Sequence, residues 1–591
     1  MKDKNRKLHP LGKVVWALVL AVPALWTGHL VHLYGVDIPY WDQWNGTCPL
    51  FEKMDEGTLR LADFFAFHNE HRIFFPRLIM FGLAKVTHWN MRAEFLVVWI
   101  LAVACALNLW RLVRATGWSR PGTGYLLLLA ANILLFTPLE QENWLWGFQI
   151  GFLLPPACVT ACLWLAVAAR FPFNFLFTMV FSTVCTFSGA SGFTCWFLTF
   201  PLLLLPNGRI QWRDRKGWWL VWLLGGLATI FLYFHGYEKP AHHPSMMGAV
   251  RDPIPAFQYL CAYLGGPFAH GTGFEAATVG QPVGAVLLLA LVAVAVYLWR
   301  WRRDDKLLSQ TLPWLMLTFV ALLNAFLTAV GRQGFGVNHA FNSRYLAFSV
   351  MLPIGLLFLV PLIFNHWRAR ASSAQHTVAV SMGLSAFATA LVLLHGLGAL
   401  KDVRSWPEAQ HLRLTAKALI HLINVVDEPE ALGRYVHAIV PPLKARANLL
   451  DRLGYLRPGL VRTNSIREIA GTSPLAPTRY GEIQQAGKPA AGQFGMAGWS
   501  VLPDKVRPAD AVLLTYDDAR GDPLIFALAE VGIQRADVAG SLRQPAYLRS
   551  GWIKTFNTNR LPSGALSLRA WAFDAETCHA YPVQGVAASP P

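Results

Sequence analysis

Long apolar segments separated by short polar ones dominate the pattern of this chain. The first follows a basic head, MKDKNRK, and has no small-x-small cleavage site, which predicts an uncleaved signal anchor. Ten further segments approach the length of about 20 residues that a membrane-spanning helix needs. They lie near 94–112, 122–138, 149–169, 171–187, 191–206, 217–235, 280–299, 311–330, 345–364 and 375–398. The pattern predicts a polytopic α-helical membrane protein with about 11 transmembrane helices.

One apolar stretch does not fit this series. Ile73 to Val86 is only about 14 residues long, short of the length of a membrane span. We therefore expect an interfacial or re-entrant helix here. If this stretch crossed the bilayer instead, every later loop would change sides.

The pattern changes after Leu400 to that of a water-soluble region. Pro407 to Leu450 carries apolar residues at helical spacing. From about Pro489 the chain turns to short strand-like runs separated by Pro, Gly and Asp, which predict a β-sandwich. These runs are QFGMAGWSVL, DAVLLTY, LIFALAEV, SGWIKTF and ALSLRAWAF. The expected domains are a transmembrane domain (1–400), a helical linker region (401–488) and a sandwich domain (489–591).

Composition and charge agree with a membrane protein. Hydrophobic residues make up 54% of the 591 residues and charged residues only 14%. The net charge of +17 comes mostly from basic clusters in short connections such as RIQWRDRK and WRRDDK. Because Lys and Arg concentrate on the cytoplasmic side of membrane proteins, the clusters place the N-terminus inside and the C-terminal region outside. They do not indicate a nucleic-acid partner.

The opposite, extracytoplasmic side collects the unusual polar segments. The longest is the first outer loop, Val36 to Arg77. The others are PLEQENW (138–144), SGASG (188–192), HGYEKPAHHPSMMGAVRDP (235–253) and GRQGFGVNHAFNSRY (331–345). We expect a functional site to lie on this side.

The start of the first outer loop, DIPYWDQW, offers candidates for a general base. Asp42, between Trp41 and Trp44, is placed to take a proton from an acceptor hydroxyl at the water-accessible end of the membrane domain. Asp37 is a close competitor. The alternative interpretation is an interfacial aromatic belt with incidental acids, since Trp and Tyr favour the depth of the lipid headgroups.

HNEHR, later in the same loop, brings together His68, Glu70, His71 and Arg72. These residues suit orienting a sugar, coordinating a divalent metal or neutralising a phosphate. HxxH alone is a weak metal signal, and Asp42 or Glu70 would have to complete such a site. The alternative is a set of hydrogen bonds that starts the following helix.

GRQGFGVNHAFNSRY presents Arg332, His339 and Arg344 among glycines. Arginine binds phosphate in a bidentate way, and glycines let backbone amides approach an anion. The expected role is phosphate recognition; the alternative is that these arginines pair with Glu140 or Glu142.

EQENWLW places Glu140, Glu142 and Asn143 at the entrance to a span, where they either pair with the arginines or hold sugar hydroxyls. His242 and His243, in the 235–253 loop, belong either to a mobile loop over the site or to an ordinary solvated loop.

Several motifs are missing from the sequence. There is no Walker A loop, HExxH helix, GxSxG elbow or Rossmann fingerprint, which disfavours a nucleotide-driven pump or a serine hydrolase. Of the eight cysteines, only Cys48 and Cys578 fall in regions predicted to be extracytoplasmic, so a disulfide is conceivable only there.

Taken together, DIPYWDQW, HNEHRIFFPRL, ENWLWGFQ, FSGASGF, GRQGFG and SRY make roughly residues 10 to 400 resemble a bacterial membrane glycosyltransferase of the GT-C class. The resemblance implies an inner-membrane enzyme that uses a polyprenyl-phosphate-linked sugar on the outer face of the membrane. Asp42 (or Asp37) would activate the hydroxyl of a glycan, lipid or protein acceptor, which displaces polyprenyl phosphate with inversion. The arginines of GRQGFGVNHAFNSRY would stabilise the leaving phosphate, and HNEHR would order donor and acceptor.

WDQW and HNEHR differ from the motifs of the aminoarabinose and protein mannosyl transferases of this class. Neither a metal requirement nor the identity of the sugar carries over. Two other functions compete with transfer: a flippase for lipid-linked sugars and an envelope glycan polymerase or ligase. A flippase should carry charges at mid-membrane on several helices, whereas this sequence concentrates them in the outer loops.

Overall fold

The computed structural model describes residues 10–118, 121–205, 215–239, 244–245, 247–371, 374–472, 475–487, 490, 492–562, 565 and 567–588. The chain divides into two compact units. The helical unit comprises Met1–Gly35, Arg60–Phe81 and Arg92–Trp406. The C-terminal unit comprises Val36–Leu59, Gly82–Met91 and Pro407–Pro591. The first outer loop is therefore shared between the two units.

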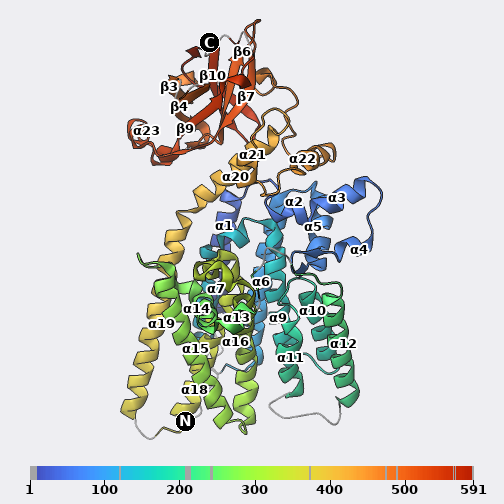
Figure 1. Cartoon of the computed structure of the whole chain (residues 1–591). Helices are drawn as coiled ribbons and strands as arrows, with labels where there is room; N and C mark the ends of the chain where they lie inside the picture. The colour runs from blue at the N-terminus through green and yellow to red at the C-terminus, as the bar shows by residue number, and fades with distance from the viewer. Residues whose placement is uncertain are drawn as a thin grey trace. The chain divides into compact units, whose positions relative to one another are not determined.

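Long apolar helices build the helical unit (Figure 1). Among the described residues, nine helices are long and apolar enough to cross a bilayer, which confirms that the protein is membrane-embedded. The elements concerned are α1 (Pro10–Tyr34), α6 (Met91–Ala115), α7 (Pro121–Leu135), α9 (Ile150–Ala168), α12 (Lys216–Phe234), α15 (Ala276–Arg300), α16 (Asp305–Arg332), α18 (Met351–Arg368) and α19 (Ala374–Val403). α7 alone has 15 residues, and its span, Gly122–Trp144, also includes the short helix α8 (Gln141–Trp144).

Two of the predicted spans are shorter helices. They are α10 (Phe173–Thr186) and α11 (Thr194–Leu204), of 14 and 11 residues. At about 1.5 Å per residue, both are shorter than the roughly 30 Å hydrocarbon core of a bilayer. The stretch expected to be interfacial or re-entrant forms α5 (Phe74–Thr87), whose 14 residues are likewise too few to cross as a straight helix.

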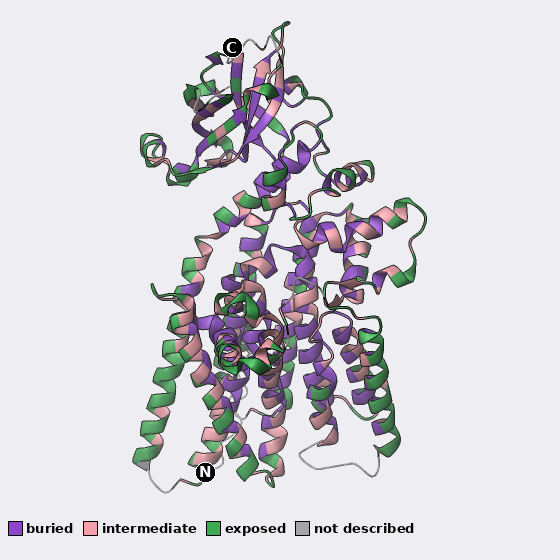
Figure 2. Ribbon diagram, in the orientation of Figure 1, coloured by how far each residue is buried: buried purple, intermediate pink, exposed green. Residues whose placement is uncertain are grey.

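The outer surface of the long helices is apolar. Along α12, for example, Leu220, Leu224 and Phe231 are each more than half exposed. Figure 2 shows this exposed surface along α12 and α19. Exposed apolar side chains over the length of a helix are stable only where lipid replaces water. The surface therefore agrees with a bilayer around this unit.

The helix α14 (Pro253–Gly265) was not anticipated from the sequence. Its 13 residues are too few for a span, and the apolar stretch they form is short. It packs on α15 through glycines: a Cβ on Gly284 would collide with the backbone oxygen of Cys261, and one on Gly265 with that of Gly280. Only glycine at these positions allows the two backbones to approach so closely.

We expect Gly284→Ala to lower the unfolding temperature of the detergent-solubilised protein. The added methyl meets a backbone atom that cannot move aside, and overpacking of this kind costs about 1–3 kcal/mol. Gly383→Ala on α19 is the matched control, because a Cβ there has no neighbour within 4 Å. Equal unfolding temperatures for the two variants would contradict the close packing of α14 on α15.

Three helices and two antiparallel sheets form most of the C-terminal unit. The helices are α20 (Trp406–His421), α21 (Pro429–Tyr435) and α22 (Leu443–Arg452). One sheet has the order β11-β10-β6-β7, with β12 beside β10, and the other β3-β4-β9-β8, with β5 beside β4. The shorter or outer strands are β3 (Gly481–Gly487), β5 (Arg507–Pro508), β8 (Val531–Ile533), β11 (His579–Pro582) and β12 (Ala587–Ala588). The five strand-like runs of the sequence correspond to β4 (Gln493–Leu502), β6 (Ala511–Asp517), β7 (Pro523–Ala529), β9 (Gly551–Asn557) and β10 (Ser567–Asp574).

Alternating side chains of both sheets meet in one buried cluster. Met496 and Trp552 come from the β4–β9 pair, and Leu514, Ala527 and Ala570 from β6, β7 and β10. Burying a large side chain such as Trp552 removes its apolar surface from water, which stabilises the pairing of the sheets. The first outer loop adds two short helices to this unit, α2 (Asp42–Gly46) and α3 (Cys48–Asp55).

Candidate functional site

The HNEHR segment forms a small hairpin in the helical unit. Strand β1 (Phe67–His68) pairs with β2 (His71–Arg72), and the turn between them consists of Asn69 and Glu70. Asn69 has φ 51°, a left-handed conformation that asparagine tolerates better than most residues. The hairpin fixes the direction in which Glu70 and the two flanking histidines project.

Glu70 lies between Arg332 and His71 and contacts both. Its Oε1 accepts a hydrogen bond from Nη2 of Arg332, at the end of α16, and lies 3.4 Å from Nε2 of His71. The Nδ1 of His71 accepts the backbone N–H of Ala190 at 3.1 Å. That bond requires an unprotonated Nδ1, so the ring proton of neutral His71 sits on Nε2, which lies near Glu70. Loops 67–72, 188–192 and the end of α16 thus meet here.

Arg72 closes the end of α12 rather than pointing its charge at this group. Its Nε donates to the carbonyl of Tyr233 (3.0 Å), Nη1 to that of Phe65 (2.8 Å) and Nη2 to that of His235 (2.5 Å). The guanidinium also lies 4.1 Å from the ring centroid of Phe67. Two of these carbonyls, those of Tyr233 and His235, lie at the C-terminus of α12, where a helix leaves orphan acceptors. Arg72 therefore has a structural role, at the end of α12 and not at the helix start that the alternative interpretation predicted.

A second ion pair joins the loop after α7 to the loop before α18. Nη1 of Arg344 donates to Oε1 of Glu142 at 3.0 Å, and Ser343 Oγ lies 3.4 Å from Oε2 of Glu142. This is the pairing that the alternative interpretation of the arginines predicted. Asn143 is fully buried and donates its amide to Glu140 Oε2 (3.0 Å) and to the carbonyl of Arg344 (3.2 Å).

His339 connects the two ion pairs electrostatically. Its Nδ1 lies 2.9 Å from the hydroxyl oxygen of Tyr259 on α14. Burial, followed by the positive charges of Arg344 and Arg332, lowers the pKa of His339 to about 4. The imidazole is therefore neutral at neutral pH, and both arginines are close enough to influence it. Arg332, His339 and Arg344 thus influence one another electrostatically, and phosphate recognition by this group stays a prediction.

The lowered pKa of His339 makes stability depend on pH. In the unfolded chain its pKa returns to about 6.5, so between about pH 6.5 and pH 4 the unfolded state binds a proton that the folded state does not. This contribution to stability is complete above about pH 6.5 and decreases as the pH falls towards 4. We expect His339→Gln to flatten the decrease in unfolding temperature on acidification over this range; parallel pH profiles for the two proteins would contradict this.

Both candidate bases belong to the C-terminal unit. Oδ1 of Asp37 accepts the backbone N–H of Met91 at 2.8 Å, which caps the first turn of α6. Asp42 is the first residue of α2 and follows Trp41, whose φ of 44° and ψ of −115° are strained for a non-glycine residue. Strained backbone gathers at functional sites. Asp37 thus has a structural role at a helix start, and the strain lies beside Asp42.

His68 and the region around it show what sequence reasoning missed. The ring of His68 packs against Phe148, with centroids 5.1 Å apart. One residue earlier, Gly147 leaves room for the carboxylate of Glu94, which is fully buried at the start of α6. Glu94 and Tyr259 were not anticipated, because each occurs in an otherwise apolar segment of the sequence. For Glu94, the presence of a single carboxylate in such a segment could have indicated a buried polar site.

The remaining expectations from the sequence concern a metal site, a disulfide and the two histidines of the 235–253 loop. No group of three or more His, Cys, Asp or Glu side chains in the described part of the chain is arranged to hold a metal ion. Cys48 and Cys578 are separate, buried thiols, so the conceivable disulfide is not formed. His242 and His243 lie outside the described residues.

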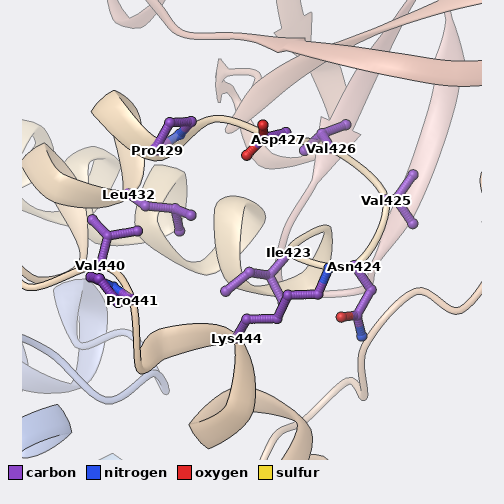
Figure 3. A pocket seen from close by; sticks show the side chains of 10 residues that line it. All are labelled: Ile423, Asn424, Val425, Val426, Asp427, Pro429, Leu432, Val440, Pro441 and Lys444. Atoms are coloured by element: carbon purple, nitrogen blue, oxygen red, sulfur yellow. The ribbon is translucent and has the colours of Figure 1, made fainter.

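A cavity of about 290 Å³ lies in the C-terminal unit, beside α21 and the start of α22 (Figure 3). Its lining is mainly apolar, with Ile423, Leu432 and Val440 among the side chains, and its charged members are Asp427 and Lys444. None of the predicted site residues lines this cavity.

No protein-family model, no curated protein and no solved structure matches this chain.

Proposed function

We propose that the protein is a membrane glycosyltransferase of the GT-C type. In this proposal it transfers a sugar from a polyprenyl-phosphate-linked donor to an acceptor hydroxyl, with inversion, on the outer face of a bacterial inner membrane. The N-terminus is cytoplasmic, eleven segments cross or enter the bilayer, and the C-terminal sheets form an extracytoplasmic β-sandwich.

The observation that carries the proposal is the group formed by Arg332, His339 and Arg344 at the loop end of an apolar helical unit. It combines two guanidinium groups, which hold phosphate in a bidentate way, with a neutral imidazole. A lipid-linked donor needs this combination: a bilayer for its polyprenyl chain and cationic donors for its phosphate. As the bond to the sugar breaks, the negative charge on the phosphate grows, and preorganised arginines stabilise it.

Each arginine also has a carboxylate partner, Glu70 or Glu142. The side chains of both pairs are partly exposed, with 17–29% of their surface accessible. In the proposed mechanism the donor phosphate shares the guanidinium groups with these carboxylates. The carboxylates then keep each guanidinium oriented before the donor binds, and Glu142 binds sugar hydroxyls, while buried Asn143 holds Glu140 and the Arg344 backbone in place.

Asp42 is the proposed base. It removes the proton of the acceptor hydroxyl while that oxygen attacks the anomeric carbon, and polyprenyl phosphate leaves with the bonding electron pair. Asp37 is the weaker candidate, since it caps α6.

The distribution of charge favours transfer over transport. Within the described long helices, Asp, Glu, Lys and Arg lie near helix ends, as with Glu94 in α6 and Arg332 in α16. A transporter of charged lipids would place such residues near mid-membrane.

The test is to incubate the purified protein with a polyprenyl-phosphate sugar and a mixture of acceptors in proteoliposomes. Release of polyprenyl phosphate together with a glycosylated product supports the proposal. Movement of the intact donor across the bilayer without its consumption would instead favour the flippase.

A further inference from the structure

One mostly buried arginine ties the loop that carries Asp42 to the rest of the C-terminal unit. Arg446, on α22, donates from Nε and Nη2 to the two carboxylate oxygens of Glu52 (2.9 and 3.4 Å). Its Nη1 donates to the carbonyl of Trp44 (2.7 Å) and to Oδ1 of Asn45 (2.9 Å). Only 13% of the Arg446 side chain is exposed. One guanidinium therefore ties α22 to both α2 and α3.

A second attachment holds the residue directly before Asp42. The backbone N–H of Trp41 donates to the carbonyl of Val436 at 3.2 Å, and the Trp41 ring lies 6.0 Å from that of His437. Trp41 has the strained φ of 44°. A non-glycine residue keeps such a conformation only when its surroundings enforce it, and here part of those surroundings is the 436–437 segment.

Aromatic packing supplies a third attachment. Phe51 of α3 is fully buried and lies 5.1 Å from the ring of Tyr455 and 4.8 Å from that of Trp89. Such edge-to-face aromatic contacts stabilise an interface beyond the area that they bury. Residues 41 to 51 are thus held at three separate places along Val436 to Tyr455.

We propose that the segment Val436–Tyr455 positions Asp42, with Arg446 as the positioning residue. The catalytic part of this inference rests on the proposed function, in which Asp42 is the base; the attachment of the loop does not. It follows that this part of the C-terminal unit fixes the conformation of the loop that carries Asp42.

The chain offers a matched control on the same helix. Arg452 of α22 also pairs with an acid of α3, Asp55, at 2.7 Å, but 64% of its side chain is exposed. An exposed pair contributes little, whereas Arg446 makes several bonds out of water. Arg446→Gln, Arg446→Lys and Arg452→Gln therefore separate the loss of the attachment from the mere loss of a charge.

The experiment measures hydrogen exchange and turnover on the full-length protein in detergent. In Arg446→Gln we expect about tenfold or faster exchange in peptides covering residues 40–52, because buried charge-assisted bonds are lost. We expect kcat to fall by about 100-fold through misplacement of Asp42, with the KM for the donor unchanged. Arg446→Lys should recover part of kcat, since lysine keeps the charge but not the fork. Arg452→Gln should match the wild type.

Unchanged exchange of residues 40–52 in Arg446→Gln would overturn the inference, as would faster exchange with an unchanged kcat. Peptides from β4 and β9 report whether the unit itself remains folded; if they also exchange faster, Arg446→Lys replaces Arg446→Gln and the same criteria apply. A wild-type protein without any transfer activity would refute the proposed function alone, and the exchange data would still decide whether Val436–Tyr455 holds the loop.

Discussion

Asp42→Asn should reduce sugar transfer by about 10²- to 10⁴-fold, the range that a general base contributes. Asparagine keeps the shape and can still start α2, but it cannot take the proton of the acceptor hydroxyl. The KM for the donor should change little, because the donor phosphate is assigned to the arginines. The measurement is release of polyprenyl phosphate at saturating donor, with the unfolding temperature recorded to show that the variant is folded.

Asp37→Asn is the control for this prediction. Its side-chain oxygen can still accept the N–H of Met91, the bond that Asp37 makes in the structure. We therefore expect turnover near that of the wild type. If Asp37→Asn were inactive and Asp42→Asn active, the base would be Asp37. Retained turnover in both variants would remove the first-loop acids from the mechanism.

Arg332→Gln should lower kcat by about 10²- to 10³-fold, the usual effect of removing one donor to a developing negative charge. The KM for the donor should also rise, since the phosphate loses a bidentate partner. The complication is Glu70, whose carboxylate loses its ion-pair partner in this variant. Loss of activity could then come from the unpaired acid rather than from the phosphate.

The double variant Arg332→Gln/Glu70→Gln separates these causes. It removes both members of the pair, so no unpaired carboxylate remains. If Arg332 binds the donor phosphate, the double variant stays inactive, while Glu70→Gln alone retains most of its turnover, because its amide oxygen can still accept from Arg332 and keep the guanidinium oriented. Recovery of turnover in the double variant would show that Arg332 serves only to pair with Glu70.

The sequence anticipated some parts of this arrangement well. The long apolar helices and the five strand runs of the C-terminal region were correctly located, because segment length and apolar alternation are local properties. α14 was missed, since a helix of 13 residues carries no length signal. The two shorter helices α10 and α11 were predicted as spans because apolar composition alone does not fix where a helix ends.

The site could be predicted less completely. That Arg332, His339 and Arg344 would lie together followed from their closeness in the chain. Their partners did not: Glu70 lies 262 residues from Arg332, and Glu142 lies 202 residues from Arg344. For Arg344 the sequence named Glu142 among two alternatives; for Arg332 it named no correct partner.

By itself, then, the sequence determined that this protein is embedded in a membrane and that its C-terminal region forms sheets. Only the tertiary structure decided that Arg72 closes a helix end, that Asp37 caps α6, and that the Asp42 loop packs with the C-terminal unit. The reason is physical. Burial and strand alternation are set by neighbours along the chain, whereas ion pairs, helix caps and loop attachments form between segments that only folding brings together.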